Sequence, residues 1–203
     1  MTVPSSPEPD GEPRLGTLGD VAAVVALHAD RIAEGFLVSL GPRFLGRLYR
    51  RIVVSRGAFL LIHDDARGPA GFVAVAENTH QLYREFLLRD GIRAGLAAAP
   101  TVLRRPRMVW ETLRYGTGAG PGDVPSAEIL AVAVAPRAAG RGVGSRLVVA
   151  ALEELQARDV HAASVVTALD NAPALHMYAR AGFRPRARTE VHRGVPQEVL
   201  VWP

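Results

Sequence analysis

The chain reads VAPRAAGRGVGS from Val134 to Ser145, directly after the apolar run EILAVA of residues 128–133. An apolar residue at nearly every position is typical of a central strand that is buried on both faces. After the glycines, apolar positions recur at helical spacing over residues 142–158. These positions are Leu147, Val148, Ala151, Leu152 and Leu155. A buried strand, a glycine-rich loop and a helix in this order predict an α/β fold.

The glycine-rich loop is suited to binding an anion. The first amide groups of a helix have no partner within the helix, and the helix dipole adds partial positive charge there. Glycines let phosphate oxygens approach the backbone, because no Cβ stands in the way. Two arginines add charge and a serine adds a hydroxyl group. The candidate residues are Arg137, Gly140, Arg141, Gly142, Gly144 and Ser145.

Three nucleotide-binding patterns and a ligand-free turn compete for this loop. A Walker loop requires Lys before Ser or Thr, and the chain contains no Lys, so this pattern is excluded. A dinucleotide-binding loop starts directly after its strand, but residues 135–139 intervene and Ser145 takes the third glycine position. Asp159, the acid near the expected spacing, precedes the next strand instead of ending it. A ligand-free turn and a site for the pyrophosphate of coenzyme A remain open.

Two segments carry a resemblance to a known family. Arg137-Ala-Ala-Gly140-Arg-Gly142 resembles the [Gln/Arg]-x-x-Gly-x-[Gly/Ala] signature of the GNAT superfamily of acetyl-CoA-dependent N-acetyltransferases. The segment NAPALHMYARAGF, residues 171–183, is also similar to that family and stands at the family's separation from the first. The resemblance extends over residues 17–203 and is strongest over 126–184.

The resemblance implies a fold, a cosubstrate and roles for particular residues. The fold is a mixed, mostly antiparallel sheet of six or seven strands flanked by four or more helices. The sheet splays beside Val132 to admit acetyl-CoA, whose acetyl group an amine attacks directly, without a covalent intermediate or a metal. In the family, backbone groups bind the pantetheine arm and the pyrophosphate, an Asn contacts the arm, and one strand amide faces the thioester carbonyl. Carried over, the cofactor site comprises Val132, Ala133, Val134, Arg137, Gly140, Arg141, Gly142, Val143, Gly144, Ser145 and Asn171.

Two residues are candidates for proton transfer. By resemblance, Tyr178 is the general acid that protonates the sulfur, since a phenol keeps its proton at neutral pH; the alternative is a core aromatic on an amphipathic helix. Glu128, at the start of the central strand, is the candidate base, and the alternative is a surface carboxylate. Other groups that could face an acceptor are Glu34, Glu77 and His80. The six histidines of the chain do not have the spacing of metal ligands, so no metal is expected.

Residues 1–16 are rich in Pro, Ser and acidic side chains and are expected to form a disordered tail before a single domain, residues 17–203. Further helices are expected over 17–34, after Gly41-Pro42, over 80–88, 101–115 and 171–181. Further strands are expected at 58–63, 71–75, 162–167, 183–191 and 195–202, the last two turning at 192–194.

Composition limits the function classes. The chain of 203 residues has no Cys, so disulfides and thiolate chemistry are excluded, and all 24 basic residues are Arg. Neither a signal peptide nor an apolar stretch near membrane length is present, which predicts a soluble, cytoplasmic protein without a membrane partner. The Arg-rich segment 84–114 suggests the alternative of a nucleic-acid partner. Its arginines are spaced as on solvated helix faces, without aromatic residues between them, so no nucleic-acid partner is expected.

Sequence leaves the acceptor open: a small-molecule amine and a peptide amine both fit, and a homodimer is one arrangement that stays open. A rival class is a non-catalytic domain that binds or senses acyl-CoA. Such a domain would keep the glycine loop and would not need the acid at Tyr178.

Overall fold

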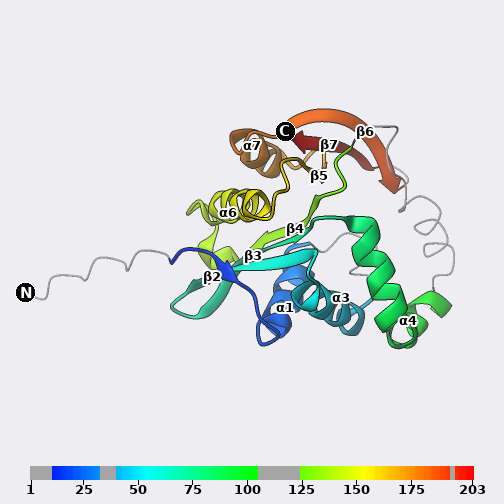
Figure 1. Ribbon diagram of the computed structural model, residues 1–203. Helices are drawn as coiled ribbons and strands as arrows, with labels where there is room; N and C mark the ends of the chain where they lie inside the picture. The colour runs from blue at the N-terminus through cyan, green and yellow to red at the C-terminus, as the bar shows by residue number, and fades with distance from the viewer. Residues whose placement is uncertain (1–10, 33–39, 105–123, 193–194) are drawn as a thin grey trace, which may run out of the picture.

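The computed structural model of the chain describes residues 11–32, 40–104, 124–192 and 195–203, in which a seven-stranded sheet carries helices on both faces (Figure 1). The strands are β1 (Arg14–Leu15), β2 (Ala58–Asp65), β3 (Gly68–Ala76), β4 (Glu128–Val134), β5 (Ala163–Ala168), β6 (Arg184–His192) and β7 (Val195–Trp202). The helices are α1 (Val21–Arg31), α3 (Pro42–Val54), α4 (Thr79–Arg104), α6 (Val143–Ala157) and α7 (Ala172–Arg180), with a 3₁₀ turn, η1, at Pro136–Ala138.

The strand order is β1-β2-β3-β4-β5-β7-β6. Neighbouring strands pair antiparallel except β4 and β5, which are parallel. The chain passes from β4 to β5 through η1 and α6, the helical crossover that a parallel pair requires. The predicted mixed, mostly antiparallel sheet with helices on both sides is therefore confirmed.

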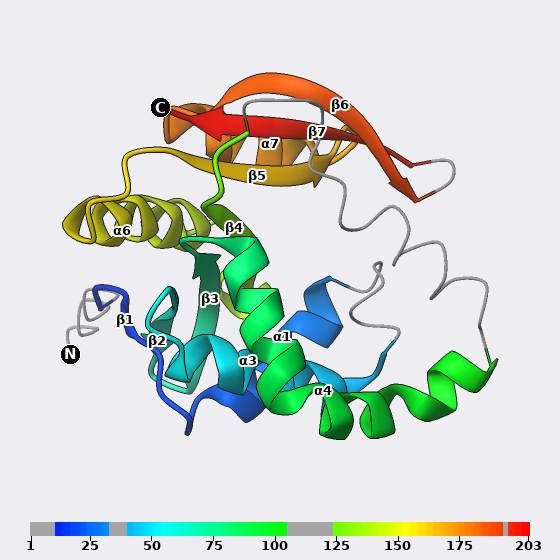
Figure 2. The ribbon, with the colours of Figure 1, turned by 45° about the vertical axis from the view of Figure 1, so that its right-hand side comes forward.

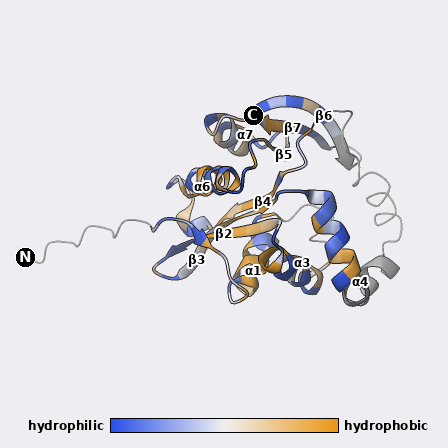
Figure 3. Cartoon of the chain, in the orientation of Figure 1, coloured by the Kyte–Doolittle hydropathy of each residue, from blue (hydrophilic) through white to orange (hydrophobic). Residues whose placement is uncertain are grey.

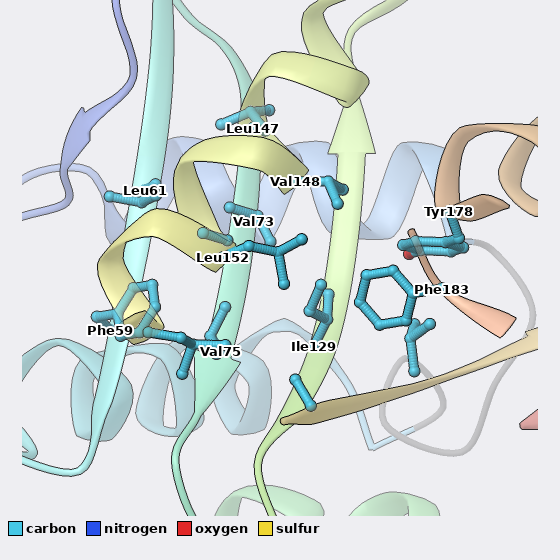
Figure 4. Packing of buried hydrophobic residues seen from close by; sticks show 14 of the residues in the cluster. Phe59, Leu61, Val73, Val75, Ile129, Leu147, Val148, Leu152, Tyr178 and Phe183 are labelled. Atoms are coloured by element: carbon cyan, nitrogen blue, oxygen red, sulfur yellow. The ribbon is translucent and has the colours of Figure 1, made fainter. Parts of the chain in front are cut away.

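Each face of the sheet has its own core. Helices α6 and α7 cover one face and α1, α3 and α4 cover the other, and strands β2–β4 between them consist largely of hydrophobic residues (Figures 1 and 3). On the α6 face, Leu147 and Leu155 are fully buried against the sheet, and Tyr178 packs beside Phe183 (Figure 4). No helix among the described residues is long and apolar enough to cross a bilayer.

The other core joins α1 to α3 through a buried polar pair. The imidazole of His28 on α1 shares a 2.6 Å hydrogen bond with the hydroxyl of Tyr49 on α3. Its ring stacks on Phe72 of β3, with ring centroids 6.3 Å apart. Burial lowers the pKa of His28, so the imidazole stays neutral at pH 7 and the pair costs no buried charge.

The first helix begins later than its apolar pattern indicates. Residues 17–20 form a turn, because the carboxylate of Asp20 accepts hydrogen bonds from the amide of Thr17 at 2.7 Å and from its hydroxyl at 2.8 Å. The helix then begins at Val21, whereas the pattern predicted Thr17. Its predicted end at residue 34 lies outside the described residues.

Part of the expected tail is ordered in the sheet. Arg14 and Leu15, which the sequence placed in the tail, form β1 and pair with Ile62 and Leu61 of β2. The guanidinium of Arg14 also bonds Asp20 at 2.8 Å, which attaches the strand to the start of α1. Residues 1–10 lie outside the described part of the chain.

The middle of the chain is one helix where the sequence predicted two. Helix α4 runs continuously from Thr79 to Arg104, across the gap left between 80–88 and 101–115. Gly91 and Gly95 weaken the helical signal in this gap. Tertiary contacts compensate, since Arg51 of α3 pairs with Glu85 at 3.4 Å and with Asp90 at 2.7 Å. Residues 105–115 of the predicted second helix, and 193–194 of the predicted last turn, are not described.

Replacing Asp20 with Asn should lower the free energy of unfolding by about 1–2 kcal/mol at pH 7, because a carboxylate that accepts charged hydrogen bonds is lost. Its bonds to Arg14 and Thr17 hold the pKa of Asp20 well below the usual range. This contribution is present above the unfolded-state pKa, about 4, and decreases as pH falls toward the folded-state pKa. Urea unfolding at pH 7 and pH 3 should show a smaller difference at pH 3; an equal difference at both would contradict the ionic role.

Candidate functional site

The central strands β4 and β5 separate after two residue pairs. β4 pairs with β3 along its whole length, but with β5 only at Glu128↔Ser164 and Ile129↔Val165. Opposite Ala74 and Val75 of β3 the register shifts, so Leu130 is an extra residue in β4. Such a bulge bends its strand, and this one comes directly after the last residue paired with β5. The sheet therefore splays beside Val132, as the resemblance implies (Figure 2).

The hydrogen-bond pattern shows which backbone groups face the gap. The amide of Ala135 donates to the carbonyl oxygen of Ala70 at 2.8 Å, so this opposed pair is hydrogen-bonded. Because bonded and non-bonded pairs alternate in an antiparallel ladder, Ala133 also points its backbone groups at β3. The N–H and C=O groups of Val132 and Val134 then point into the gap. Of the three residues expected to pair with a pantetheine arm, Val132 and Val134 have this orientation and Ala133 does not.

The glycine loop opens α6 as predicted. Gly140 and Gly142 have φ angles of 75° and 76°, which side-chain-bearing residues rarely adopt, and Gly142 is the N-cap of the helix. The first bond of the helix runs from the amide of Arg146 to the carbonyl oxygen of Gly142, at 3.0 Å. The amides of Val143, Gly144 and Ser145 precede it in the first turn, where helix N–H groups have no partner within the helix. A Cβ at Gly140 would meet nothing within 4 Å, so the loop is open to a ligand.

Two glycines allow the first turn of α6 to pack closely against the sheet and against α7. A Cβ at Gly71 of β3 would lie 3.0 Å from side-chain atoms of Val143 and Leu147, a tight contact, so glycine favours the close approach of the helix. A Cβ at Gly144 would lie 2.9 Å from the sulfur of Met177 on α7. The amides of this turn are thus held beside the end of β4.

The two predicted arginines have contacts within the protein. Arg137 bonds Asp65 at 2.7 Å and the carbonyl oxygen of Pro69 at 2.8 Å, and so joins η1 to the β2–β3 turn. The ion pair with Arg137 lowers the pKa of Asp65. Arg141 is exposed, and its carbonyl oxygen accepts a bond from Arg146 at 3.1 Å. Arg137 therefore shapes the loop in this structure, and contact of either arginine with a phosphate stays a prediction.

Tyr178 is both a core residue and a site candidate. Only 5% of its surface is exposed, its ring packs edge-on against Phe183 at 5.5 Å, and its hydroxyl oxygen is directed toward β4 (Figure 4). Burial raises the pKa of Tyr178, so the hydroxyl keeps its proton at neutral pH. Asn171 is exposed and precedes α7, where its side-chain oxygen accepts a 3.3 Å bond from the amide of Ala174. Asn171 is thus the cap of α7, whereas Tyr178 lies within the helix and is buried.

Glu128 lies at the start of β4, on the face of the sheet that α4 covers. Its neighbour Ile129 is buried in the α6-side core, and successive side chains of a strand point to opposite faces. Burial raises the pKa of Glu128 to about 7, so its carboxyl group exchanges protons near neutrality. Burial, and then the charge of Glu128, raise the pKa of Tyr83 on α4 to about 12, which places the two side chains near each other.

The other candidate bases are less suited or are not described. The carboxylate of Glu77 bonds Arg158 at 2.9 Å, an ion pair that joins β3 to the end of α6. His80 is exposed at the start of α4. Glu34 lies outside the described residues. Among the described residues, no cluster of three or more His, Asp or Glu side chains could hold a metal ion.

Sequence reasoning missed two residues of this region. Gly71 was assigned only to a strand, although a lone glycine within a strand indicates close approach of another element. Tyr83 lies one turn before the exposed Leu87 on α4, and nothing in its local sequence marks its proximity to Glu128. The role of Gly71 could have been recognised from the sequence. The position of Tyr83 near Glu128 could not, because it depends on how α4 crosses the end of β4.

Comparison with known proteins agrees with this geometry. Residues 36–183 match the acetyltransferase (GNAT) family. The mycothiol acetyltransferase of Arthrobacter sp. (strain FB24) is 38% identical over 74 residues, which are 36% of this chain and 22% of that protein. The mycothiol acetyltransferase of Clavibacter michiganensis is 44% identical over 61 residues, 30% of this chain and 20% of that protein. The chain thus matches about a fifth of the length of these curated relatives.

Solved structures share the fold. The ribosomal-protein-S18-alanine N-acetyltransferase of Escherichia coli superposes with a TM-score of 0.59 at 12% identity, over 94% of this chain and 92% of that one. A spermidine N-acetyltransferase variant from Vibrio cholerae superposes with a TM-score of 0.60 at 16% identity, over 95% of this chain and 94% of that one. At such identities the likeness concerns the fold alone.

Replacing Glu128 with Gln should stabilise the protein above pH 7. Because the folded-state pKa of Glu128 is about 7 and the unfolded-state value is about 4.3, folding costs free energy once the group must ionise. The wild-type protein therefore loses stability relative to the Gln variant as pH rises from about 4 to 7. Thermal unfolding at pH 4.5 and pH 8 tests this; a variant equal to or less stable than wild type at pH 8 would contradict the raised pKa.

Proposed function

The chain belongs to the GNAT family of acetyltransferases, and we propose that it transfers an acetyl group from acetyl-CoA to a primary amine of a small molecule or peptide. The observation that carries this proposal is the separation of β4 from β5 next to the first turn of α6. One region thus offers strand-type backbone bonds at Val132 and Val134 and an anion site at Gly140–Ser145.

The shape of coenzyme A fits these two features. Its pantetheine arm carries amide groups that can pair with backbone groups facing the gap, as an added strand would. Its pyrophosphate is an anion of the kind that a helix N-terminus with glycines favours. The cosubstrate supplies the thioester; the protein supplies Val132 and Val134 for the arm and the amides of Val143, Gly144 and Ser145 for the phosphates.

Acetyl transfer forms one bond and breaks another. The nitrogen of a neutral amine attacks the thioester carbon, the C–N bond forms and the C–S bond breaks. The amine loses a proton, and the leaving sulfur gains one. A backbone amide of β4 that faces the gap, at Val132 or Val134, can stabilise the negative charge that develops on the carbonyl oxygen.

Tyr178 is proposed to protonate the sulfur. Its raised pKa keeps the proton available at neutral pH, and its hydroxyl is directed toward β4 (Figure 4). Packing against Phe183 fixes the ring in one orientation, which a general acid needs.

Glu128 is proposed to accept the amine proton. A base works best when its pKa lies near the operating pH, and the pKa of Glu128 is about 7. Its side chain lies on the face of α1, α3 and α4, so the acceptor would approach from that face.

The partners that follow are an amine acceptor and acetyl-CoA, with no nucleic acid or membrane, in the cytoplasm. The names of the similar proteins mention mycothiol, an alanine of ribosomal protein S18 and spermidine, and they do not choose among acceptors. A non-catalytic acyl-CoA-binding domain is the second candidate, since the loop and gap alone would serve it.

Acetyl-CoA should bind the purified protein with micromolar affinity, and Gly142→Glu should abolish binding detectable by calorimetry. Glutamate at φ 76° is strained, and its carboxylate would repel the phosphates. Gly11→Glu, at an exposed glycine with nothing within 4 Å, adds the same charge as a control and should bind normally. NADH and 3′-dephospho-CoA serve as comparison ligands. If neither acetyl-CoA nor another acyl-CoA bound the wild type, the enzyme assignment would fail.

Tyr178→Phe should lower kcat about 100-fold with little change in acetyl-CoA affinity, because it removes a proton donor and keeps the buried ring. Release of free thiol from acetyl-CoA with an amine found by screening measures this. An unchanged rate across pH would exclude Tyr178 as the acid. A wild-type protein that binds acetyl-CoA but acetylates no amine in a broad screen would favour the non-catalytic candidate.

A further inference from the structure

A groove of about 590 Å³ lies between α1 and α3, on the side of α3 that faces away from the sheet. The inward side of α3 carries Leu45, Leu48 and Ile52, which are buried in the core, whereas the groove is lined by the opposite side. Its lining residues are Leu18, Val21, Ala22, Val25, Pro42, Arg43, Gly46, Arg47 and Arg50.

Three arginines of α3 line one wall of the groove. Arg43, Arg47 and Arg50 are spaced four and three residues apart, so they lie on one side of the helix. The Nε atom of Arg47 is buried and has no hydrogen-bond partner within the described part of the chain, an arrangement that costs free energy.

These arginines have no acidic partner in the described part of the chain, while neighbouring charges are compensated. Arg51, which follows Arg50 on α3, pairs with Glu85 and Asp90 of α4. Asp20, the acid next to the first turn of α1, is bonded to Arg14. Three positive charges therefore converge on a groove that has no negative side chain in its lining.

The opposite wall is apolar. Leu18, Val21, Ala22 and Val25 of the α1 side line it, and Leu18 exposes 44% of its surface. Binding sites for small molecules combine apolar walls with a few convergent polar groups, and their volumes are roughly 300–1,000 Å³. The groove has both properties, and its polar groups are all cationic donors.

We propose that the α1–α3 groove binds a small phosphate monoester that carries an apolar group. A phosphate monoester has nearly two negative charges at pH 7 and three acceptor oxygens, which match three guanidinium groups better than a single carboxylate does. The apolar group lies against Leu18, Ala22 and Val25, and the phosphate lies against Arg43, Arg47 and Arg50. The guanidinium group of Arg47 donates to a phosphate oxygen.

This site is distinct from the proposed acetyl-CoA site. The groove lies on the helices of one face, whereas Gly140–Ser145 begin α6 on the other face (Figure 1). Occupancy of the groove can therefore be measured whether or not the protein is an acetyltransferase. Because acetyl-CoA itself carries phosphates, the α6 loop must be blocked in any test with a phosphate probe.

The probe is octyl phosphate, titrated by calorimetry into the full chain at saturating coenzyme A and below the probe's critical micelle concentration. We expect binding by the wild type that is at least tenfold tighter than that of octanoate, and no binding of octanol. If coenzyme A does not bind, the titration is repeated on Gly142→Glu, whose groove is unaltered. Equal binding of octanol and octyl phosphate would overturn the proposal, since the arginines would then contribute nothing.

Two pairs of variants localise the site. Arg47→Gln should weaken octyl phosphate binding about tenfold or more, since hydrogen bonds to charged groups are worth about 1.5–3 kcal/mol. Arg84→Gln, which changes the same charge at an exposed position of α4 outside the groove, should bind like wild type. Ala22→Glu should bind much more weakly than Ala22→Gln, because the two side chains differ only in charge at an exposed position of the wall.

Other occupants give different results. Binding that is equally weak in Arg47→Gln and Arg84→Gln indicates non-specific attraction to a basic surface and overturns the proposal. Binding to vesicles of anionic lipid, without binding of monomeric octyl phosphate, indicates a membrane surface in place of a small ligand and also overturns it. Circular dichroism of each variant confirms that a loss of binding is not a loss of fold.

Discussion

The structure depends on a break in the hydrogen bonding of its central strand. Backbone groups in the interior of a sheet are nearly always paired, because a buried unpaired amide or carbonyl group costs free energy. The backbone groups of β4 that face β3 are paired along the strand, but β5 pairs with only the first two residues of β4. The extra residue Leu130 bends the strand at that point, and the groups of Val132 and Val134 face a gap that solvent or a ligand must fill. A ligand with amide groups can replace the missing strand, and the proposed acetyl-CoA site therefore coincides with this break in the sheet.

The position of the glycine loop is fixed by the elements that pack around it. Gly71 lets Val143 and Leu147 rest directly on β3, and Gly144 lets α7 approach the first turn of α6. Arg137 joins η1 to the β2–β3 turn through Asp65, which limits movement of the segment between β4 and the helix. Amides held in this way would need no reorganisation to bind an anion. Preorganised dipoles stabilise a charge more strongly than mobile dipoles do.

The sequence predicted the part of the molecule whose signals are local. Strand β4, the glycine-rich loop that follows it, α6, and Tyr178 on α7 follow from hydrophobic spacing and from the positions of the glycines. It could not predict that Asp20 closes a turn and delays α1, or that Arg137 bonds Asp65, because both depend on partners distant in the chain or on side-chain geometry. Helix α4 was predicted as two helices; its ion pairs with α3 and the burial of Leu82 and Phe86 depend on tertiary structure, which local sequence does not reveal.

Residue alternation shows why the candidate base was the hardest residue to place. In a regular strand, Glu128, Val132 and Val134 would share one face. The bulge at Leu130 adds one residue and reverses the faces before it, so Ile129 joins Val132 and Val134 on the side of α6. Glu128 is thereby directed toward α4 and Tyr83, away from the core that contains Tyr178. One irregular residue thus accompanies the opening of the gap and places Glu128 and Tyr178, the proposed base and acid, on opposite faces of the sheet. An amine entering from the α1, α3 and α4 face would then meet the base first, while the leaving sulfur would lie on the side of the acid.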